Sequence, residues 1–402
     1  MRRAIREQAS DDGPPSLVTP AFVALAAAAL AFFVAAGIVL PIAPRFAKEE
    51  LQAGSVGVGL AIASFSIAAL VLRPVVGWSS DRFGRRPLLI GGSLITVGAL
   101  ALHLVATELP ILIVARCLLG VGEGFFFVAA LASASDLAPP ARRVEALSFL
   151  SLSLYLGVAI GPPIGEALLG IGSYPAVWLA AGAVATLALG LSWLTPESAP
   201  TLTGATSGRP RAPLIHPAGL FPGLVIFLGL WGMAGFFTFL PLHAPQVGLE
   251  GAGLPLVIYA LIVVALRIVG ARLPDRFGAA RLSGVALAVS AVGLAVIGLV
   301  ATPAGLIAGT IVFAAGVSFI MPALLSLAVS RVAETERGTV VGTASLFLDL
   351  AFGIAPVGLG VIAEGVGYGP TFVVSAVLAL VASGLLFARR RALEAGPPPA
   401  IA

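Results

Sequence analysis

Charged residues, cysteine and lysine are all scarce in this chain of 402 residues, of which only 10% carry a charge. The single cysteine, Cys117, excludes an intrachain disulfide, and we expect it to be a small buried side chain. The only lysine, Lys48, lies outside any Gly-x-x-x-x-Gly-Lys-Ser/Thr loop, which argues against a nucleotide-driven pump. His103, His216 and His243 have no partner at metal-ligand spacing, so we expect neither a metal site nor a cofactor.

Long apolar segments dominate the rest of the sequence. Hydrophobic residues make up 59% of the chain, and the mean hydropathy of +1.07 is far from the range of soluble globular proteins. Twelve apolar windows reach or approach the ~20 residues that cross a bilayer as a helix: 19–43, 55–79, 87–107, 110–134, 145–169, 174–195, 219–243, 252–273, 281–301, 303–330, 338–363 and 370–388. The sequence therefore predicts an all-α integral membrane protein with twelve transmembrane helices.

A repeat divides the chain into two similar parts. The tetrapeptide Asp-Arg-Phe-Gly occurs at Asp81 and again at Asp275, 194 residues later. The same offset relates three further pairs: Arg73 and Arg267, Arg143 and Arg337, and Pro162 and Pro356. We therefore expect two pseudo-symmetric six-helix halves, residues 1–195 and 219–402, joined by a polar linker at 196–218.

The basic residues predict the orientation in the membrane. Of the 23 Lys and Arg residues, 18 lie in the segments that share a side with both termini, whereas Arg45 and Lys48 lie on the other side. The remaining three, Arg73, Arg116 and Arg267, lie within spans. Because positive charge is retained in the cytoplasm, we expect a multi-pass protein of the cell membrane with both termini cytoplasmic. The net charge of +4 is thus explained by topology and does not predict binding to nucleic acid.

The charged turn between the second and third windows carries a family resemblance. Residues 77–86 read Gly-Trp-Ser-Ser-Asp-Arg-Phe-Gly-Arg-Arg and resemble the signature loop of the major facilitator superfamily of secondary transporters, with a degenerate copy at 270–278. The resemblance implies the fold of that family and no particular substrate. It also implies a cytoplasmic gate built from these charged residues: Asp81, Arg82, Arg85, Arg86, Arg73, Asp275, Arg276 and Arg267. The alternative is that they anchor the loop in every state.

The fourth window holds the strongest candidate for proton coupling. Arg116, Gly120 and Glu123 recur at i, i+4 and i+7, which places them on one helix face with the two charges ~10 Å apart. The stretch resembles the fourth-span motif of the family, whose arginine is implicated in proton coupling, although Leu119 replaces the usual glutamine. Burial favours the protonated form of a carboxyl and a nearby arginine favours the ionised form, so we expect Glu123 to carry a proton. The alternative is a structural pair with a buried arginine.

Two further acids lie within spans. Asp349, in the eleventh, takes the place that Tyr155 has in the first half, and an acid that breaks the repeat suggests proton coupling or substrate binding. A structural pairing of Asp349 with Arg73 or Arg116 is the alternative. Glu166 lies near the outer end of the fifth span, and we expect it to reach water.

The fifth window carries spaced glycines followed by proline. Gly157, Gly161, Pro162 and Gly165 resemble the fifth-span motif that is enriched in antiporters of the family, with Glu166 where its last glycine is expected. The resemblance implies export by antiport. Spaced glycines also allow two helices to approach closely, which is the simpler explanation of the pattern.

Phenylalanines cluster in the first, fourth, seventh and tenth windows, which line the central cavity in this family. With Glu123, the expected cavity residues are Phe33, Phe127, Phe236, Phe237 and Phe319. An apolar aromatic cavity suits a hydrophobic or amphipathic cargo, although each ring could equally meet lipid or a neighbouring helix.

The function expected from these features is a proton-coupled antiporter that exports such a small molecule. The alternative is an importer or facilitator of an organic anion or another metabolite, since Arg116 could receive an anion. A sugar is disfavoured because the spans lack Asn and confine Gln to loops. An intramembrane aspartyl protease would need two buried aspartates, and only Asp349 is clearly within a span, so we expect no enzyme. Lipid, cargo and protons are the expected partners of a monomer.

Overall fold

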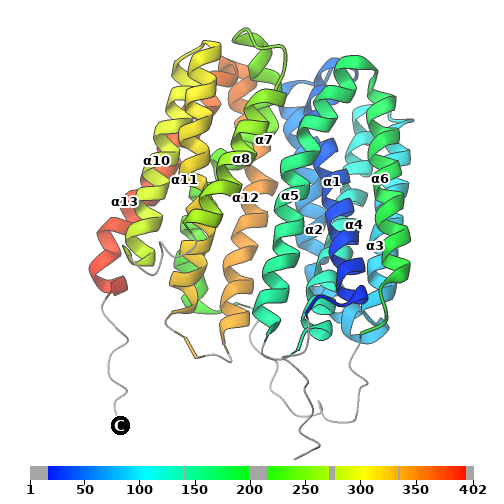
Figure 1. Cartoon of the computed structure of the whole chain (residues 1–402). Helices are drawn as coiled ribbons and strands as arrows, with labels where there is room; N and C mark the ends of the chain where they lie inside the picture. Colours follow the sequence, from blue (N-terminus) through cyan, green and yellow to red (C-terminus); the bar gives the residue numbers. More distant parts are fainter. Residues whose placement is uncertain are drawn as a thin grey trace, which may run out of the picture.

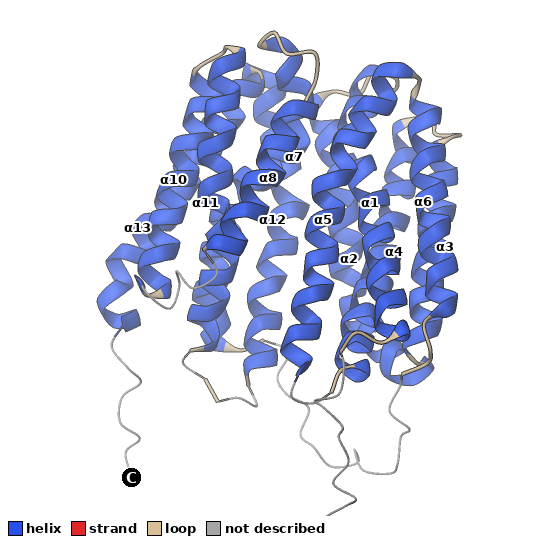
Figure 2. Ribbon diagram, viewed as in Figure 1, coloured by secondary structure: helices blue, strands red, loops and turns tan. Residues whose placement is uncertain are grey.

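The structure is a computed structural model that describes residues 17–139, 142–198, 215–270, 277–330, 332–333 and 336–394. The secondary structure of these residues is helical (Figure 2). The helices are α1 (Pro20–Glu49), α2 (Ser55–Phe83), α3 (Arg85–His103), α4 (Leu109–Leu137), α5 (Arg143–Ile171), α6 (Tyr174–Leu194), α7 (Pro217–Gln246), α8 (Gly253–Val269), α10 (Ala279–Leu299), α11 (Pro303–Val329), α12 (Arg337–Val366) and α13 (Tyr368–Glu394).

The helices confirm the prediction of an all-α membrane fold. Eleven of those in the described residues are long and apolar enough to cross a bilayer. The exception is α8, whose 17 residues form a shorter apolar helix. The last residues of the window predicted at 252–273, 271–273, lie outside the described residues. The chain is thus a multi-pass membrane protein.

The helices stand side by side in two groups (Figure 1). Helices α1 to α6 pack together on the right of the view, and α7 to α13 pack together on the left. We call the end of the bundle that holds Leu194 and Pro217 the linker face, and the opposite end, which holds the α1–α2 and α7–α8 connections, the far face.

Two tight turns show the repeat in the backbone. Gly84 caps the N-terminus of α3 with a φ of 93°, and Gly278 caps α10 with a φ of 79°. These positions are 194 residues apart. A positive φ strains any residue with a Cβ, so both halves need glycine at the same place in the turn.

Helix packing repeats in the same register. A Cβ added at Gly122 of α4 would lie 2.4 Å from Oγ1 of Thr96 on α3. The equivalent Cβ at Gly316 of α11 would lie 2.3 Å from Oγ of Ser290 on α10. Each half therefore brings its third and fourth helices together over a glycine and a small hydroxyl residue.

The glycines of α5 lie against α1. A Cβ at Gly161 would lie 2.6 Å from Cα of Gly37, and one at Gly165 would lie 2.4 Å from the carbonyl oxygen of Ile38. Cδ of Pro162 lies in the same contact, 3.3 Å from the position of a Cβ on Gly37. The spacing of these small residues thus lets two helix backbones touch, as in other membrane helix pairs.

Candidate functional site

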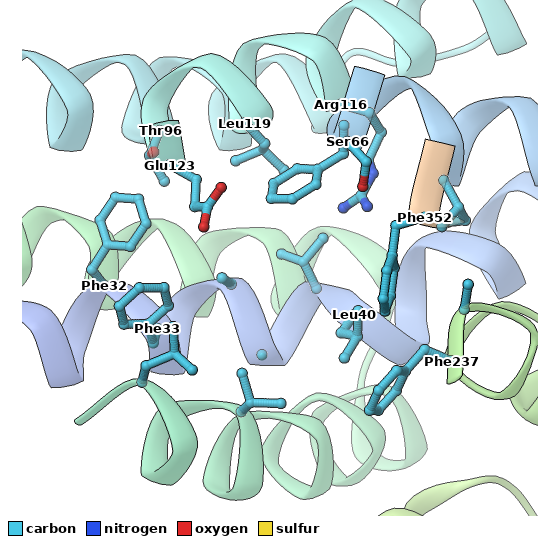
Figure 3. Close-up of a pocket in the computed structure, with 18 of the residues that line it drawn as sticks. Phe32, Phe33, Leu40, Ser66, Thr96, Arg116, Leu119, Glu123, Phe237 and Phe352 are labelled. Carbon is cyan, nitrogen blue, oxygen red and sulfur yellow. The ribbon is translucent and has the colours of Figure 1, made fainter. Parts of the chain in front are cut away.

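A cavity of about 220 Å³ lies near the middle of the bundle (Figure 3). Its walls come from α1, α2, α3, α4, α5, α7 and α12. Most of the lining is apolar, including Phe33, Leu40, Phe65, Leu119, Phe237 and Phe352. Among the described residues, its polar and charged lining consists of Ser66, Thr96, Arg116, Glu123 and Thr238.

The two charged residues of α4 both point into this cavity. Leu119 lies between Arg116 and Glu123 on the same side of the helix (Figure 3). This arrangement follows from their spacing along α4, which places residues seven apart on one face. One apolar cavity therefore contains both a fixed positive charge and a carboxyl group that can bind a proton.

Arg116 is buried, with 5% of its surface exposed. Its Nε lies 3.4 Å from the carbonyl oxygen of Ala61, and its guanidinium carbon lies 5.1 Å from the ring centre of Phe65. Within the described part of the chain, no carboxylate forms an ion pair with this guanidinium. A buried cation is unfavourable unless something compensates it, so the cavity favours an occupant that can accept hydrogen bonds from Arg116.

Glu123 lies at the other end of the cavity and is half-buried. Figure 3 places its carboxyl near Phe32, Phe33 and Thr96. Two aromatic rings of the cavity therefore lie on the side of this carboxyl.

The phenylalanines singled out from the sequence divide into two sets. Phe33 and Phe237 line the cavity. Phe127 packs edge-on against Phe33, with ring centres 6.0 Å apart. Phe236 is fully buried and packs against Phe313 at 5.1 Å, while Phe319 lies against Gly270 of α8. These three rings lie outside the cavity lining because neighbouring positions on a helix point in different directions.

Two cavity rings come from helices outside the first, fourth, seventh and tenth windows, from which the cavity residues were expected. Phe65 lies on α2 and Phe352 lies on α12. Both occur among several exposed and buried apolar residues, and no motif distinguishes them. Their place in the lining depends on the rotation of each helix about its axis.

Arg85 and Arg86 of the signature loop are held within the first half. The Nε of Arg85 forms an ion pair with Asp136 at 3.2 Å, and its Nη1 donates to the carbonyl oxygen of Ser80 at 2.7 Å. Arg86 donates to the carbonyl oxygen of Trp193 at 2.7 Å and lies over its ring. The partners lie on α2, α4 and α6, so these contacts join the loop to its own half in this structure.

The other predicted gate residues are placed less completely. Arg82 is exposed at the end of α2, and Arg267 is half-buried near the end of α8. Arg73 and Asp81 belong to α2, but their side chains lie outside the described part of the structure. Asp275 and Arg276 lie outside the described residues altogether.

The two further acids lie apart from the cavity. Asp349 is half-buried on α12, about one turn from Phe352 and closer to the linker face. Glu166 does not extend into water as expected, because its side chain is only 10% exposed and its Oε2 pairs with Nη1 of Arg45 at 3.1 Å. No motif or spacing predicts this pair, whose members lie 121 residues apart on α5 and α1.

A bundle of two helix groups around a central cavity is the architecture of a membrane transporter. The chain belongs to the Major Facilitator Superfamily, whose family model matches residues 25–273 and 246–402. The proteins of this family are transporters and not enzymes.

Relatives and solved structures agree with this assignment. An uncharacterized MFS-type transporter of Salmonella typhimurium is 28% identical over 372 residues, which cover 90% of this chain and 94% of that protein. A bacterial homolog of the human lysosomal transporter Spinster, solved in an inward-facing and occupied conformation, has a TM-score of 0.80 at 16% identity and covers 96% and 100% of the two chains. A D-xylose–proton symporter has a TM-score of 0.76 at 15% identity, with 91% and 97% covered. These structural likenesses concern the fold alone.

Proposed function

We propose that this transporter is a proton-coupled antiporter that exports a hydrophobic or amphipathic small molecule. In this proposal the halves 1–195 and 219–402 rock about the cavity, with 196–218 as the linker between them. The linker face is cytoplasmic, both termini lie in the cytoplasm, and one chain is a complete carrier. The observation that supports it best is one aromatic cavity whose described lining contains one carboxyl group, Glu123.

The exchange depends on competition between cargo and proton. An apolar cargo that fills the cavity excludes water around Glu123, and release of the cargo lets the carboxyl exchange its proton with the medium. Arg116 lies on the same helix face and favours the ionised form of Glu123 by Coulomb attraction. Glycines of α5 packed on α1 provide a close contact that can transmit movement to the cavity, since Phe33 and Gly37 of α1 line it.

Arg116 supports a second candidate function, the import of an organic anion. An anion bound at this guanidinium would be repelled by ionised Glu123, so the anion and a proton would bind together. They would then cross the membrane in the same direction. The two candidates therefore differ in the sign of the coupled proton movement.

Proteoliposomes with a trapped pH dye and no initial gradient distinguish the two. Lipophilic cations, neutral drugs and organic anions are added outside, one at a time. Exchange predicts that the lumen becomes alkaline as cargo enters and protons leave. Joint transport of an anion with a proton predicts that the lumen becomes acidic.

The control variants link the signal to Glu123. Glu123→Gln is expected to abolish the pH change for every active compound, whereas Glu108→Gln removes a carboxylate from a far-face loop and should leave it intact. Acidification of the lumen by every active compound would contradict antiport. Full coupled exchange in the Glu123→Gln protein would remove this residue from the mechanism.

A further inference from the structure

The two halves touch closely at the far face, where α2 of the first half crosses α12 of the second. A Cβ added at Gly59 would lie 2.2 Å from the carbonyl oxygen of Pro356. One added at Gly360 would lie 2.6 Å from the carbonyl oxygen of Ser55. The two backbones are therefore in direct contact, and the structure is closed along this pair of helices at the far face.

A side chain of the second half holds the N-terminus of α2. Oε2 of Glu364 accepts a hydrogen bond from the backbone N–H of Val56 at 3.1 Å. The same carboxylate lies 2.9 Å from the position of a Cβ on Gly54, the N-cap residue, which has no side chain to cap the helix itself.

The first half makes the reciprocal contact with α8. Ala252 is the N-cap residue of α8 and provides no side-chain cap. Oε2 of Glu166 on α5 lies 2.7 Å from the position of a Cβ on Gly251, and Cβ of Glu166 lies 3.3 Å from the position of a Cβ on Gly253, the first residue of α8. Arg45 fixes this carboxylate from its own half through the ion pair at 3.1 Å.

These contacts share one physical principle. The first N–H groups of a helix lack partners within the helix, and the helix dipole favours a negative charge there. α2 and α8 are the second helices of the two halves. Each has a carboxylate from the opposite half at its N-terminus: Glu364 accepts a hydrogen bond from Val56 of α2, and Glu166 lies against the start of α8.

We propose that Glu364 and Glu166 form a far-face latch that stabilises the far-face-closed state of the transport cycle. A cap within one half would survive any movement of the halves. These caps must break when the far face opens, because each carboxylate and its helix belong to different halves. The latch requires only that the halves move apart at this face, and it does not depend on the cargo or on proton coupling.

The test measures the distance between the halves by pulsed electron spin resonance. Spin labels are placed on cysteines at Val105 and Val300, which are exposed in far-face connections of the first and second halves, in a Cys117→Ser background. A carboxylate at a helix N-terminus changes the equilibrium between the closed and open states of the far face by about fivefold. Glu166→Gln with Glu364→Gln should therefore raise the ratio of long to short distances by ~25-fold, and either single variant by about fivefold.

Glu108→Gln is the matched control. This residue is also a far-face carboxylate at a helix N-terminus, but it forms no side-chain cap and precedes α4 of its own half. Its distance distribution should equal that of the unmutated protein. Glu364→Gln alone, at an exposed side chain, provides the test if the double variant does not fold. An unchanged distribution in the folded Glu364→Gln protein would overturn the latch, whatever the outcome of the transport assays.

Discussion

Replacement of Gly161 by alanine tests whether backbone contact between α1 and α5 holds the first half together. The new Cβ would lie 2.5 Å from the carbonyl carbon of Gly37 and 2.6 Å from the backbone nitrogen of Ile38. Both are backbone atoms, which cannot rotate away as a side chain can. The helices would therefore have to separate by about 1 Å to restore ordinary contact distances.

The expected loss of stability follows from two opposing effects. Overpacking of a close contact costs about 1–3 kcal/mol, whereas alanine is better than glycine in a helix by ~1 kcal/mol. Gly170→Ala on the same helix has only the favourable helix propensity of alanine, because a Cβ there would meet nothing within 4 Å. We therefore expect Gly161→Ala to be less stable than Gly170→Ala by about 1–3 kcal/mol.

The single cysteine allows a direct assay. Cys117 is partly buried on α4, so a thiol-reactive dye reports when the bundle opens during heating in detergent. The apparent Tm of Gly161→Ala should lie below that of Gly170→Ala by a few degrees. Equal Tm values for the two variants would refute the claim that direct backbone contact at Gly161 is required.

Two further predictions concern the signature loop and the cavity. Gly84→Ala introduces a side chain at a φ of 93° and 2.5 Å from Oε2 of Glu197, whereas Gly278→Ala meets the strain of its φ of 79° with nothing within 4 Å. Gly84→Ala should therefore show the lower Tm in the same dye assay, and equal values would show that the contact with Glu197 is unimportant. Arg116→Gln removes a positive charge ~10 Å from Glu123. The Coulomb attraction over that distance is ~1.7 kcal/mol at an effective dielectric constant of about 20. Its loss should raise the pH of half-maximal exchange by about one unit. Arg142→Gln, at a half-exposed arginine just before α5, is the control, and an unchanged pH profile in Arg116→Gln would argue against electrostatic coupling to Glu123.

The helices and the repeat could be predicted because they depend on local properties of the chain. A window of ~20 apolar residues must form its hydrogen bonds internally in a bilayer, so windows such as 174–195 and 303–330 became helices near their predicted bounds. The turn at Gly84 could likewise be predicted, since its motif recurs at Gly278. Both glycines adopt a positive φ. The shared face of Arg116 and Glu123 followed from their spacing alone.

The tertiary structure decided which of these residues meet. The sequence alone does not distinguish Phe237 from Phe236, yet the first lines the cavity and the second packs into the second half. The pairs of Glu166 with Arg45 and of Glu364 with Val56 join helices 121 and 308 residues apart along the chain. Their formation depends on how each helix is rotated and how closely it approaches its neighbour. Those quantities arise from the packing of the whole bundle, whereas the apolar length and the repeat are present in the sequence itself.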